Sequence, residues 1–325
     1  MTVLCTADIH LTDNPRDEYR WGLLPWLGER GADELIIAGD LTNAKNRHDA
    51  ILVNRMAKEY RKLSRKFKKI WIVKGNHDYY DTDNPFFEFL GDEGYNITFV
   101  SSRLITGSSI GTIFFIPAGA SWDDIPKVDF IFTHATFNGA EAENGTLLPG
   151  IDPSILRDFG GKCYSGDIHV PQSVNKRITY IGAPYHVRFG DRFKPRVLHI
   201  YDDGETEDLY FPAPKKFVFD IVQPEDLLEE RAKKGDHVKV RCHLRRPEYA
   251  KWRDYQKQIR DIAVKREWLL YGAEPIAIDV LVKPGGPQQT QARQSADELM
   301  VSYAKKHKAG DDYLSIGRNL FSGQS

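Results

Sequence analysis

The chain has 325 residues, of which 41% are hydrophobic and 28% are charged, and its formal net charge is −1. This length provides one large domain or two of ordinary size, and the charge balance excludes a chain that is basic throughout. The three cysteines, Cys5, Cys163 and Cys242, are far apart, which excludes a disulfide framework and favours a reducing interior. With no signal peptide and no apolar run of roughly 20 residues, we expect a cytoplasmic protein that is neither secreted nor membrane bound.

The first 80 residues predict alternating strands and helices. The expected elements are strands at residues 2–7, 34–38 and 69–73 and helices at residues 17–30 and 48–67. Each strand is a short apolar run, and the second helix has apolar residues three or four positions apart. We expect the first helix to be bent or broken at Pro25. This alternation indicates a parallel sheet with covering helices.

Shorter strands predominate after residue 97. The expected elements are strands at residues 97–100, 110–116, 129–133, 162–165, 174–181 and 196–201 and a short helix at residues 152–159. The proline-rich segment 212–216 then indicates a domain boundary. Beyond it we expect strands at residues 217–222, 237–243 and 276–282 and a helix at residues 247–268.

We therefore expect three parts in the chain, a first domain at residues 1–212, a small α/β domain at 213–283, and a linker with a C-terminal helix at 284–325. Ser295 and Glu298 form a capping box for that last helix, expected at residues 295–307. In the small domain, the segment 231–266 contains 13 Lys or Arg residues and four acidic residues. Such a segment either follows a phosphate backbone or forms the solvated face of a helix.

Polar side chains follow five of the expected strands, at the point where each strand ends. They are Asp8 and His10, Asp40, Asn76 and His77, His134, and Asp167 and His169. In open α/β sheets ligands bind at the carboxyl ends of the strands, so these groups can converge although the chain separates them. Carboxylates, imidazoles and an amide suit two divalent ions that share one carboxylate. One such histidine alone is more often structural, but five turns of this kind favour a binuclear metal site.

These turns resemble the five motifs of the calcineurin-like metallophosphoesterase superfamily. The matching segments, within residues 1–200, are Asp8-Ile-His10, Gly39-Asp40, Gly75-Asn-His-Asp78, Thr133-His134 and Gly166-Asp-Ile-His169. The chain is most similar to the SbcD family of DNA-repair exonucleases, through His169-Val-Pro-Gln172, Tyr180-Ile-Gly-Ala-Pro184 and the small domain that follows. The resemblance implies an α/β fold, a two-layered β-sandwich flanked by helices, with a smaller α/β capping domain that binds DNA.

The resemblance also implies a role for each motif residue. One metal ion would be held by Asp8, His10, Asp40 and His169, and the other by Asp40, Asn76, His134 and Asp167. His77 would donate a proton near the leaving oxygen, with Asp78 as its orienting group. The ions would be manganese, with magnesium or iron as alternatives. His186 and Arg188 would contact the scissile phosphate, although Arg188 could instead pair with Asp191.

Position 167 departs from the family pattern, which has His where this chain has Asp167. With two divalent ions, a third carboxylate lowers the charge of the site from +2 to +1. We expect Asp167 to remain a ligand that holds a harder ion more tightly and attracts an anionic phosphate less strongly. Asn43 stands where some members of the family have a histidine, so the substrate role of that histidine is not expected here.

The leading hypothesis is a manganese-dependent DNA exonuclease with additional endonuclease activity, acting in DNA repair, recombination or phage DNA processing in a bacterial or phage-infected cell. The expected partners are DNA and an SbcC-type ATPase that docks on the C-terminal helix, and the family commonly forms homodimers. A phosphatase or cyclic-nucleotide phosphodiesterase is the first alternative, because the metal chemistry does not choose the substrate. A non-catalytic scaffold protein is the second, and the presence of His77 and the metal ligands counts against it.

Overall fold

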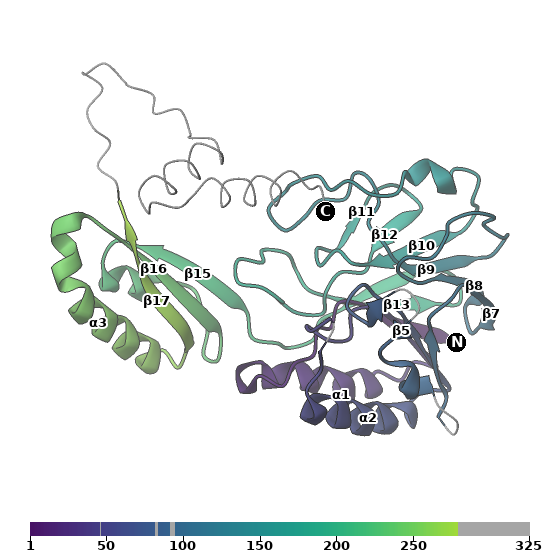
Figure 1. Ribbon diagram of the computed structural model, residues 1–325, viewed down its shortest axis with the longest axis horizontal. Coiled ribbons are helices and arrows are strands. Elements are labelled where there is room, and N and C mark those ends of the chain that lie inside the picture. Colours follow the sequence, from purple (N-terminus) through teal and green to yellow (C-terminus); the bar gives the residue numbers. More distant parts are fainter. Residues whose placement is uncertain (46, 82–83, 92–94, 279–325) are drawn as a thin grey trace, which may run out of the picture. The chain divides into compact units, whose positions relative to one another are not determined.

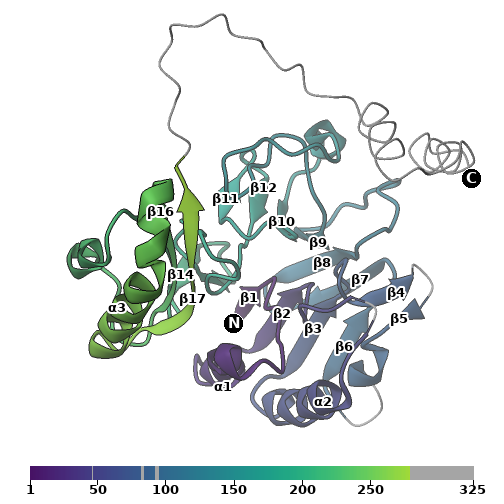
Figure 2. The same ribbon diagram turned by 60° about the vertical axis from the view of Figure 1, so that its left-hand side comes forward.

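The computed structural model describes residues 1–278 except 46, 82–83 and 92–94. The first of its two large sheets has six strands in the order β14-β13-β1-β2-β3-β6. They are β1 (Thr2–Thr6), β2 (Glu34–Ala38), β3 (Lys69–Val73), β6 (Ile97–Val100), β13 (Val197–Tyr201) and β14 (Thr206–Leu209). Figure 2 shows β1, β2, β3 and β6 side by side. The strands β1, β2, β3 and β6 are parallel, whereas β13 and β14 continue the sheet by antiparallel pairing. The four parallel strands therefore end at one edge.

Helices α1 (Leu23–Gly28) and α2 (Ala50–Ser64) cover one face of this sheet (Figure 1). The side chain of Asp49 caps α2 by accepting a hydrogen bond of 2.7 Å from the backbone N of Ile51. The apolar stripe that α2 turns inward is Leu52, Met56, Tyr60 and Leu63. Its spacing of three or four residues is the pattern that predicted the helix.

The second large sheet has the strand order β11-β12-β10-β9-β8-β7. Its strands are β7 (Leu104–Ser108), β8 (Gly111–Ile116), β9 (Phe130–His134), β10 (Lys162–Gly166), β11 (Gln172–Ser173) and β12 (Ile178–Tyr180). The inner strands β8, β9, β10 and β12 are parallel, and β7 and β11 pair antiparallel at the two edges. The parallel strands of this sheet also end together.

The two large sheets share a core of aromatic and aliphatic side chains. Trp71 of the first sheet meets Phe115 of the second, with ring centres 5.2 Å apart, and Phe115 lies 6.0 Å from Phe132. Central strands are buried on both faces, since Leu4 packs under the helices while Val3 packs between the sheets. This burial explains why the strands are continuous apolar runs in the sequence. The expected α/β sandwich flanked by helices is confirmed.

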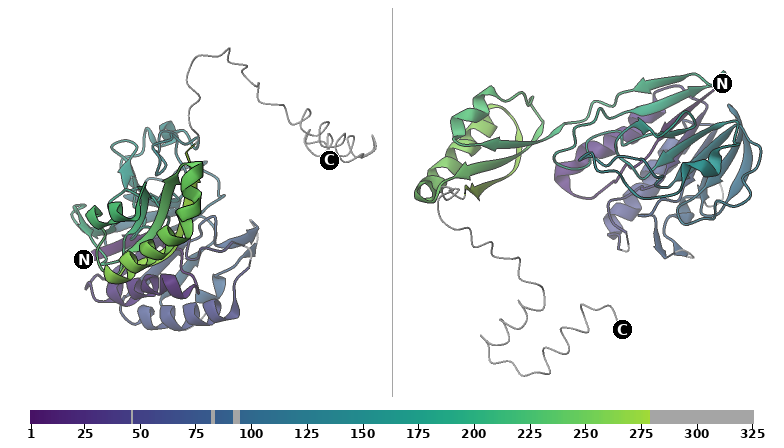
Figure 3. Two further views of the ribbon diagram at one scale, coloured as in Figure 1. Left: turned by 90° about the vertical axis from the view of Figure 1, so that its left-hand side faces the viewer. Right: turned by 90° about the horizontal axis from the view of Figure 1, so that it is seen from above.

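A third, smaller sheet consists of β15 (Lys216–Ile221), β16 (His237–Leu244) and β17 (Leu269–Ala277), parallel and in that order. Helix α3 (Trp252–Lys265) packs on one face of it through Ile259 and Ala263 (Figure 3). A small α/β unit was expected in this part of the chain, and its status as a separate domain stays a prediction. Its boundaries at residues 213 and 283 stay a prediction.

Several short elements connect these sheets. They are a two-stranded sheet of β4 (Tyr79–Asp81) and β5 (Asn84–Pro85) and 3-10 helices at Pro15–Gly22, Glu88–Gly91, Pro153–Leu156, Pro224–Glu229 and Arg246–Lys251. Among the described residues, none of the helices has the length and apolar character needed to cross a membrane.

The first helix differs from the expectation for residues 17–30. A 3-10 helix at Pro15–Gly22 precedes α1, which begins at Leu23. Pro25 is therefore the third residue of α1. It is tolerated there because the N–H groups of a first turn have no acceptor within the helix. The helix begins before the proline and is not broken by it.

The strand expected at residues 174–181 is wrong in extent, because a turn occupies its first half. The Oδ1 atom of Asn175 accepts hydrogen bonds from the backbone N of Arg177 (2.8 Å) and of Ile178 (2.9 Å). This side-chain cap closes a turn, after which β12 pairs antiparallel with β11. The helix expected at residues 152–159 is likewise shorter, a 3-10 turn at Pro153–Leu156.

The last strand of the small sheet was expected at residues 276–282, but β17 begins at Leu269, directly after α3. The sequence did not predict this strand because it contains Gly272 and Pro275, and both residue types are rare inside strands. β17 is an edge strand, where a proline can be tolerated because its missing N–H can face away from the sheet. Residues 279–282, the linker, the helix expected at 295–307 and the ATPase-docking tail lie outside the described residues.

Candidate metal centre

Five adjacent strand ends bring the expected ligands to one edge of the sandwich. Asp8 and His10 follow β1, Asp40 follows β2, Asn76 and His77 follow β3, His134 ends β9, and Asp167 and His169 follow β10. The strands β1, β2 and β3 are neighbours in the first sheet, and β9 and β10 are neighbours in the second. Parallel strands that end together thus place side chains from distant parts of the chain side by side.

Three groups of these side chains have ligand atoms within 4.8 Å of one another. They are Asp8 with His10 and His169, His10 with Asp40 and His77, and Asp8 with Asp40 and His134. Asp40 belongs to two of them, with Oδ1 3.3 Å from His134 Nε2 and Oδ2 3.7 Å from His10 Nε2. Its carboxylate is therefore positioned to be shared between two ions.

The described side chains of the site leave oxygen atoms without hydrogen-bond partners and bring like charges together, an arrangement that divalent cations would stabilise. Asp8 Oδ2 and Asn76 Oδ1 are buried and, within the described residues, have no hydrogen-bond partner. Burial, with a contribution from the negative charges of Asp40 and Asp167, raises the pKa of Asp8 to about 7. A cation would satisfy the free oxygen atoms and offset this repulsion. Carboxylate, amide and imidazole ligands together suit Mn²⁺, Mg²⁺ or Fe²⁺.

Four of these residues have left-handed backbone conformations, which residues other than glycine rarely adopt. The φ angles are 52° at Asp8, 39° at His10, 57° at Asp40 and 77° at Asp167. Backbone hydrogen bonds hold the first two strand ends together, from Asp8 N to Gly39 O (3.1 Å) and from His10 N to Asp40 O (3.0 Å). Each such conformation costs about 1–3 kcal/mol and persists because its surroundings enforce it. The strained turns direct ligand side chains into the site.

Two glycines allow the strand ends to approach closely. A Cβ atom on Gly39 would lie 2.2 Å from His134 Nδ1, which belongs to the other sheet. A Cβ atom on Gly75 would lie 2.3 Å from the backbone N of Asp40. Any larger residue at either position would push the ligands apart.

Asp78 has a role other than the expected one. Its buried carboxylate accepts hydrogen bonds from the backbone N of Gly75 (2.8 Å), Asp40 (2.9 Å) and Leu41 (2.8 Å). It therefore fixes the turns after β2 and β3 and does not orient the ring of His77. Burial and the neighbouring Asp40 raise the pKa of Asp78 to about 7.

His77 lies beside Asp40 with its ring half-buried. Its Nδ1 atom is 3.2 Å from the carbonyl of Asn43, which can only accept, so Nδ1 carries the hydrogen. Its Nε2 atom is 3.9 Å from Asp40 Oδ2, and its backbone N donates to Asp40 Oδ1 at 2.9 Å. Nε2 is therefore the atom that can exchange a proton at the site. Burial lowers the pKa of His77.

Asp167 belongs to none of the three ligand groups found among the described residues. Its Oδ1 atom accepts a hydrogen bond of 2.8 Å from Asn76 Nδ2, and its Oδ2 atom accepts one from the hydroxyl of Thr136. Oδ1 is 3.7 Å from His134 Nε2. In this arrangement Asp167 fixes the amide group of Asn76 through Nδ2 and leaves its Oδ1 atom for another partner, a role that the sequence did not suggest.

The substrate role expected of His186 is corrected by the structure. Its ring is buried, with Nε2 3.1 Å from the carbonyl of Phe193 and Nδ1 accepting from Lys216 N at 3.4 Å. Neither nitrogen is left for a phosphate. The backbone N of Arg188 donates to Asp191 at 2.9 Å, whereas its side chain is exposed. The Arg188 charge lowers the pKa of Glu143 at the site, although less than the hydrogen bond to His169 does.

Glu143 was not among the expected residues. Its Oε1 atom lies 3.0 Å from His169 Nδ1, and this contact lowers the pKa of Glu143 to about 2. Carboxylates in this position orient metal-binding histidines and raise their basicity. Glu143 lies in a loop between β9 and β10 that carries no recognisable motif, so the sequence offers no signal for it.

Arg20 was also not predicted from the sequence, and it supports the backbone of His10. Its guanidinium donates to the carbonyl of His10 and, at 3.3 Å, to the carbonyl of Val187, and it lies 3.4 Å from Asp17. Asp17 in turn accepts a hydrogen bond of 3.0 Å from the Nζ atom of Lys216. All three charged side chains are buried. This ionic chain joins the start of β15 to the strained backbone of a candidate ligand.

Comparison with known proteins finds one family model that matches the N-terminal part of the chain. Residues 1–158 match the family model described as calcineurin-like phosphoesterase. No curated protein matches the chain. Among solved structures it is similar to nuclease MPE from Pseudomonas putida, with 15% identity and a TM-score of 0.31 over 64% of this chain and 87% of that one. It is also similar to GAP50, the anchor in the inner membrane complex of Plasmodium, with 9% identity and a TM-score of 0.37 over 67% and 90%.

Proposed function

We propose that this chain, a calcineurin-like phosphoesterase in residues 1–158, is a nuclease that hydrolyses phosphodiester bonds of DNA. The family match and the grouped ligands make it a metallophosphoesterase that uses divalent metal ions. We further propose that the metal is manganese, that the protein is an exonuclease with additional endonuclease activity, and that it acts in DNA repair or phage DNA processing. The exposed Lys and Arg side chains of the small domain support DNA as the substrate.

The residues of the site divide the work of hydrolysis. Two divalent ions, when bound, supply a polarised phosphate and an activated water molecule. Asp8, His10 and His169 are grouped to hold one ion, and Asp40 and His134, which group with Asp8, would hold the other together with the free Oδ1 atom of Asn76. His77 provides Nε2 to protonate the leaving oxygen. Asp78 holds the turns that carry Asp40 and His77 in register.

The small domain carries the kind of charge that a DNA backbone requires. Of the 13 Lys and Arg residues between 231 and 266, twelve are exposed. Two form ion pairs within the described residues, Lys234 with Glu267 and Arg241 with Glu274. On a solvated helix face, basic side chains usually form ion pairs with acidic residues four positions away. Lys and Arg side chains without such a partner are available to phosphates. This observation favours a polyanionic substrate over a small phosphomonoester.

A nuclease assay with Mn²⁺ tests the proposal on single-stranded DNA, duplex DNA and bis(p-nitrophenyl) phosphate. We expect all three to be hydrolysed, and Lys257→Ala with Arg260→Ala to weaken DNA binding and lower the slope of log affinity against log salt by about 2. Lys176→Ala, at an exposed position in the turn between β11 and β12, is the matched control. Hydrolysis of the small diester while DNA stays intact would contradict the nuclease function and favour a small-molecule phosphodiesterase.

A further inference from the structure

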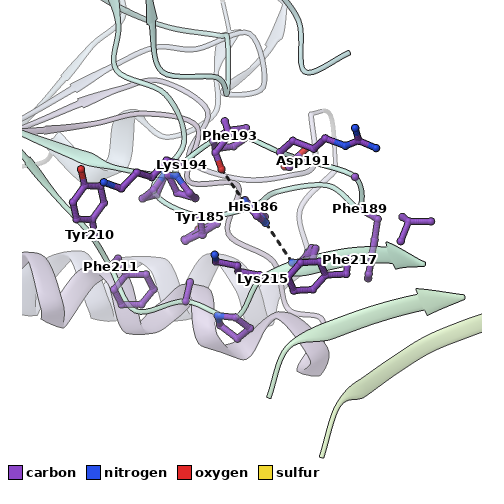
Figure 4. Close-up of a pocket in the computed structure, with 18 of the residues that line it drawn as sticks. Tyr185, His186, Phe189, Asp191, Phe193, Lys194, Tyr210, Phe211, Lys215 and Phe217 are labelled. Carbon is purple, nitrogen blue, oxygen red and sulfur yellow. Dashed lines mark hydrogen bonds between the residues drawn. The ribbon is translucent and has the colours of Figure 1, made fainter. Parts of the chain in front are cut away.

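The loop of residues 184–195 borders a pocket of about 820 Å³ that none of the roles above uses (Figure 4). The segment 210–218 forms a second wall, and Asp220 and Arg241 of the small sheet complete the lining. Pockets that bind small organic ligands commonly measure about 300–1,000 Å³. The space is therefore sufficient for one nucleotide.

Aromatic side chains form much of the wall. They are Tyr185, Phe189, Phe193, Tyr210, Phe211 and Phe217. Tyr210 is 46% exposed, and Lys194 Nζ lies 3.8 Å from the centre of its ring, on one face. Phe217 is half-buried and stacks on Phe219, with ring centres 5.5 Å apart. Rings that are supported on one side and accessible on the other suit the stacking of a base.

The lining also carries an excess of positive charge. The charged residues are Arg192, Lys194, Lys215, Lys216 and Arg241 against Asp191 and Asp220. Both acids are engaged, since Asp191 accepts from Arg188 N at 2.9 Å and Asp220 Oδ1 lies 2.8 Å from His243 Nε2. Two of the bases are engaged as well, Lys216 with Asp17 and Arg241 with Glu274. In the part of the chain that the structure describes, neither Arg192 nor Lys215 forms an ion pair. These two side chains are exposed and available to phosphate groups.

The chain that forms this wall is attached directly to the metal centre. The backbone N of Ala183 donates to the carbonyl of His169 at 2.9 Å, one residue before the wall begins. Val187, within the wall, accepts from the same Arg20 guanidinium that binds the carbonyl of His10. The loop that lines the pocket is therefore anchored beside two candidate metal ligands, His10 and His169.

We propose that the pocket binds one nucleotide of single-stranded DNA outside the scissile position, with its base on the aromatic wall and its phosphates at Arg192 and Lys215. This inference rests on the nuclease function proposed above and narrows the substrate to DNA with an unpaired or melted segment. A duplex keeps its bases stacked inside and offers none to the wall. An acidic peptide would form ion pairs with the basic side chains but would not require aromatic rings with accessible faces.

Fluorescence anisotropy with a labelled single strand tests the pocket, in a His77→Ala background with Mn²⁺ so that cleavage is slow. A second probe is the same strand made abasic, which keeps the phosphates and lacks the bases. We expect Tyr210→Ala to weaken binding of the normal strand by about 5- to 150-fold, from stacking of about 1–3 kcal/mol per base, and to leave the abasic strand unaffected. Tyr210→Phe should restore binding.

A second variant, Lys215→Ala, should weaken both strands alike, and Lys127→Ala, at an exposed position between β8 and β9, is its control. If Tyr210→Ala weakens both strands equally, or neither, the pocket does not bind a base and the inference is overturned. If polyglutamate competes as strongly as the oligonucleotide, the occupant is an acidic peptide. Wild-type protein that hydrolyses bis(p-nitrophenyl) phosphate but not DNA contradicts the nuclease function itself, which the binding experiment does not measure.

Discussion

The Nε2 atoms of His10 and His169 lie 3.1 Å apart in the interior of the protein. His10 Nδ1 faces the carbonyl of Thr42 at 3.3 Å and His169 Nδ1 faces Glu143 at 3.0 Å, so both Nδ1 atoms carry hydrogens. In neutral rings the two Nε2 lone pairs then point at each other, and a cation between them removes the repulsion. Burial lowers the pKa of His10 well below its usual range. In His169 burial is outweighed by the contact with Glu143 and the charge of Asp8, which raise its pKa, so a proton on this pair would sit on His169. The pair is arranged for a metal ion.

Glu143→Ala should weaken metal binding because it releases the ring of His169. Loss of such an outer carboxylate typically costs about 10- to 100-fold in metal affinity. Titration calorimetry with Mn²⁺ measures the change, and Glu141→Ala, an exposed acid in the same loop, is the control. Equal affinities of the two variants would show that Glu143 does not support the site.

His77→Ala should lower kcat on bis(p-nitrophenyl) phosphate by about 100- to 10,000-fold, the usual contribution of a general acid. Both metal ions should remain, because the other ligand groups are intact. His10→Ala is the contrasting variant and should lose metal as well as activity. Metal content by mass spectrometry separates the two cases, and loss of both ions from His77→Ala would contradict its role as a proton donor.

Asp78→Ala should lower the free energy of unfolding by about 3 kcal/mol or more, since three buried backbone N–H groups lose their acceptor. Denaturant unfolding measures this loss. Asp158→Ala, an exposed carboxylate, should change stability by less than about 0.5 kcal/mol. A small loss for Asp78→Ala would show that water replaces the carboxylate.

Asp167→Ala should leave two metal sites but weaken the second by about 10- to 100-fold, because Asn76 Nδ2 loses its acceptor and the amide can rotate. Asp167→Asn keeps an acceptor oxygen and should bind metal more tightly than Asp167→Ala. Metal titration followed by counting of bound ions distinguishes the outcomes. A single ion per chain in Asp167→Ala would mean that Asp167 is itself a ligand.

Lowering the pH from 7 to 5 should destabilise the fold through His237. Burial and the nearby Lys216 lower the pKa of His237 to about 4 in the folded protein. The unfolded chain takes up this proton below its ordinary pKa of about 6.5, so stability present above that pH is lost as pH falls toward 4. The loss between pH 7 and 5 is roughly 2 kcal/mol.

His237→Phe keeps a ring beside Tyr19 and Tyr271 and should remove this part of the pH dependence. Denaturant unfolding at both pH values measures it, with His243→Phe at a partly exposed position as the control. An unchanged pH dependence in His237→Phe would assign the effect to other groups.

The large sheets could be predicted from the sequence because strands buried on both faces are continuous apolar runs. The candidate ligands could be located because each follows such a run at once, as Asp40 follows β2. The edge strand β17 could not be placed, since Gly272 and Pro275 interrupt its pattern. In that case position in the sheet outweighed the intrinsic preference of the residues.

Contacts between distant loops could not be predicted, because no local pattern reports them. Glu143 and Arg20 each reach a candidate ligand from a segment without a motif. Asp78 stands in the Gly75-Asn-His-Asp78 motif, yet its three partners are backbone groups whose positions only the fold determines. Residue type suggested a proton-transfer partner, and geometry made it a structural acceptor.

The origin of the ligands in two sheets has a consequence for how the protein opens. Within the described residues the three cysteines are buried and free, so no covalent bond ties the sheets together. Ions held between His10 and His169, 159 positions apart, would act as a reversible cross-link at one edge of the sandwich. Cross-link strength would then follow metal concentration, adding RT ln(1 + [metal]/Kd) to the free energy of unfolding for each site. At low metal concentration the protein would therefore lose its hydrolytic activity, and the two sheets that provide the ligands would separate more easily.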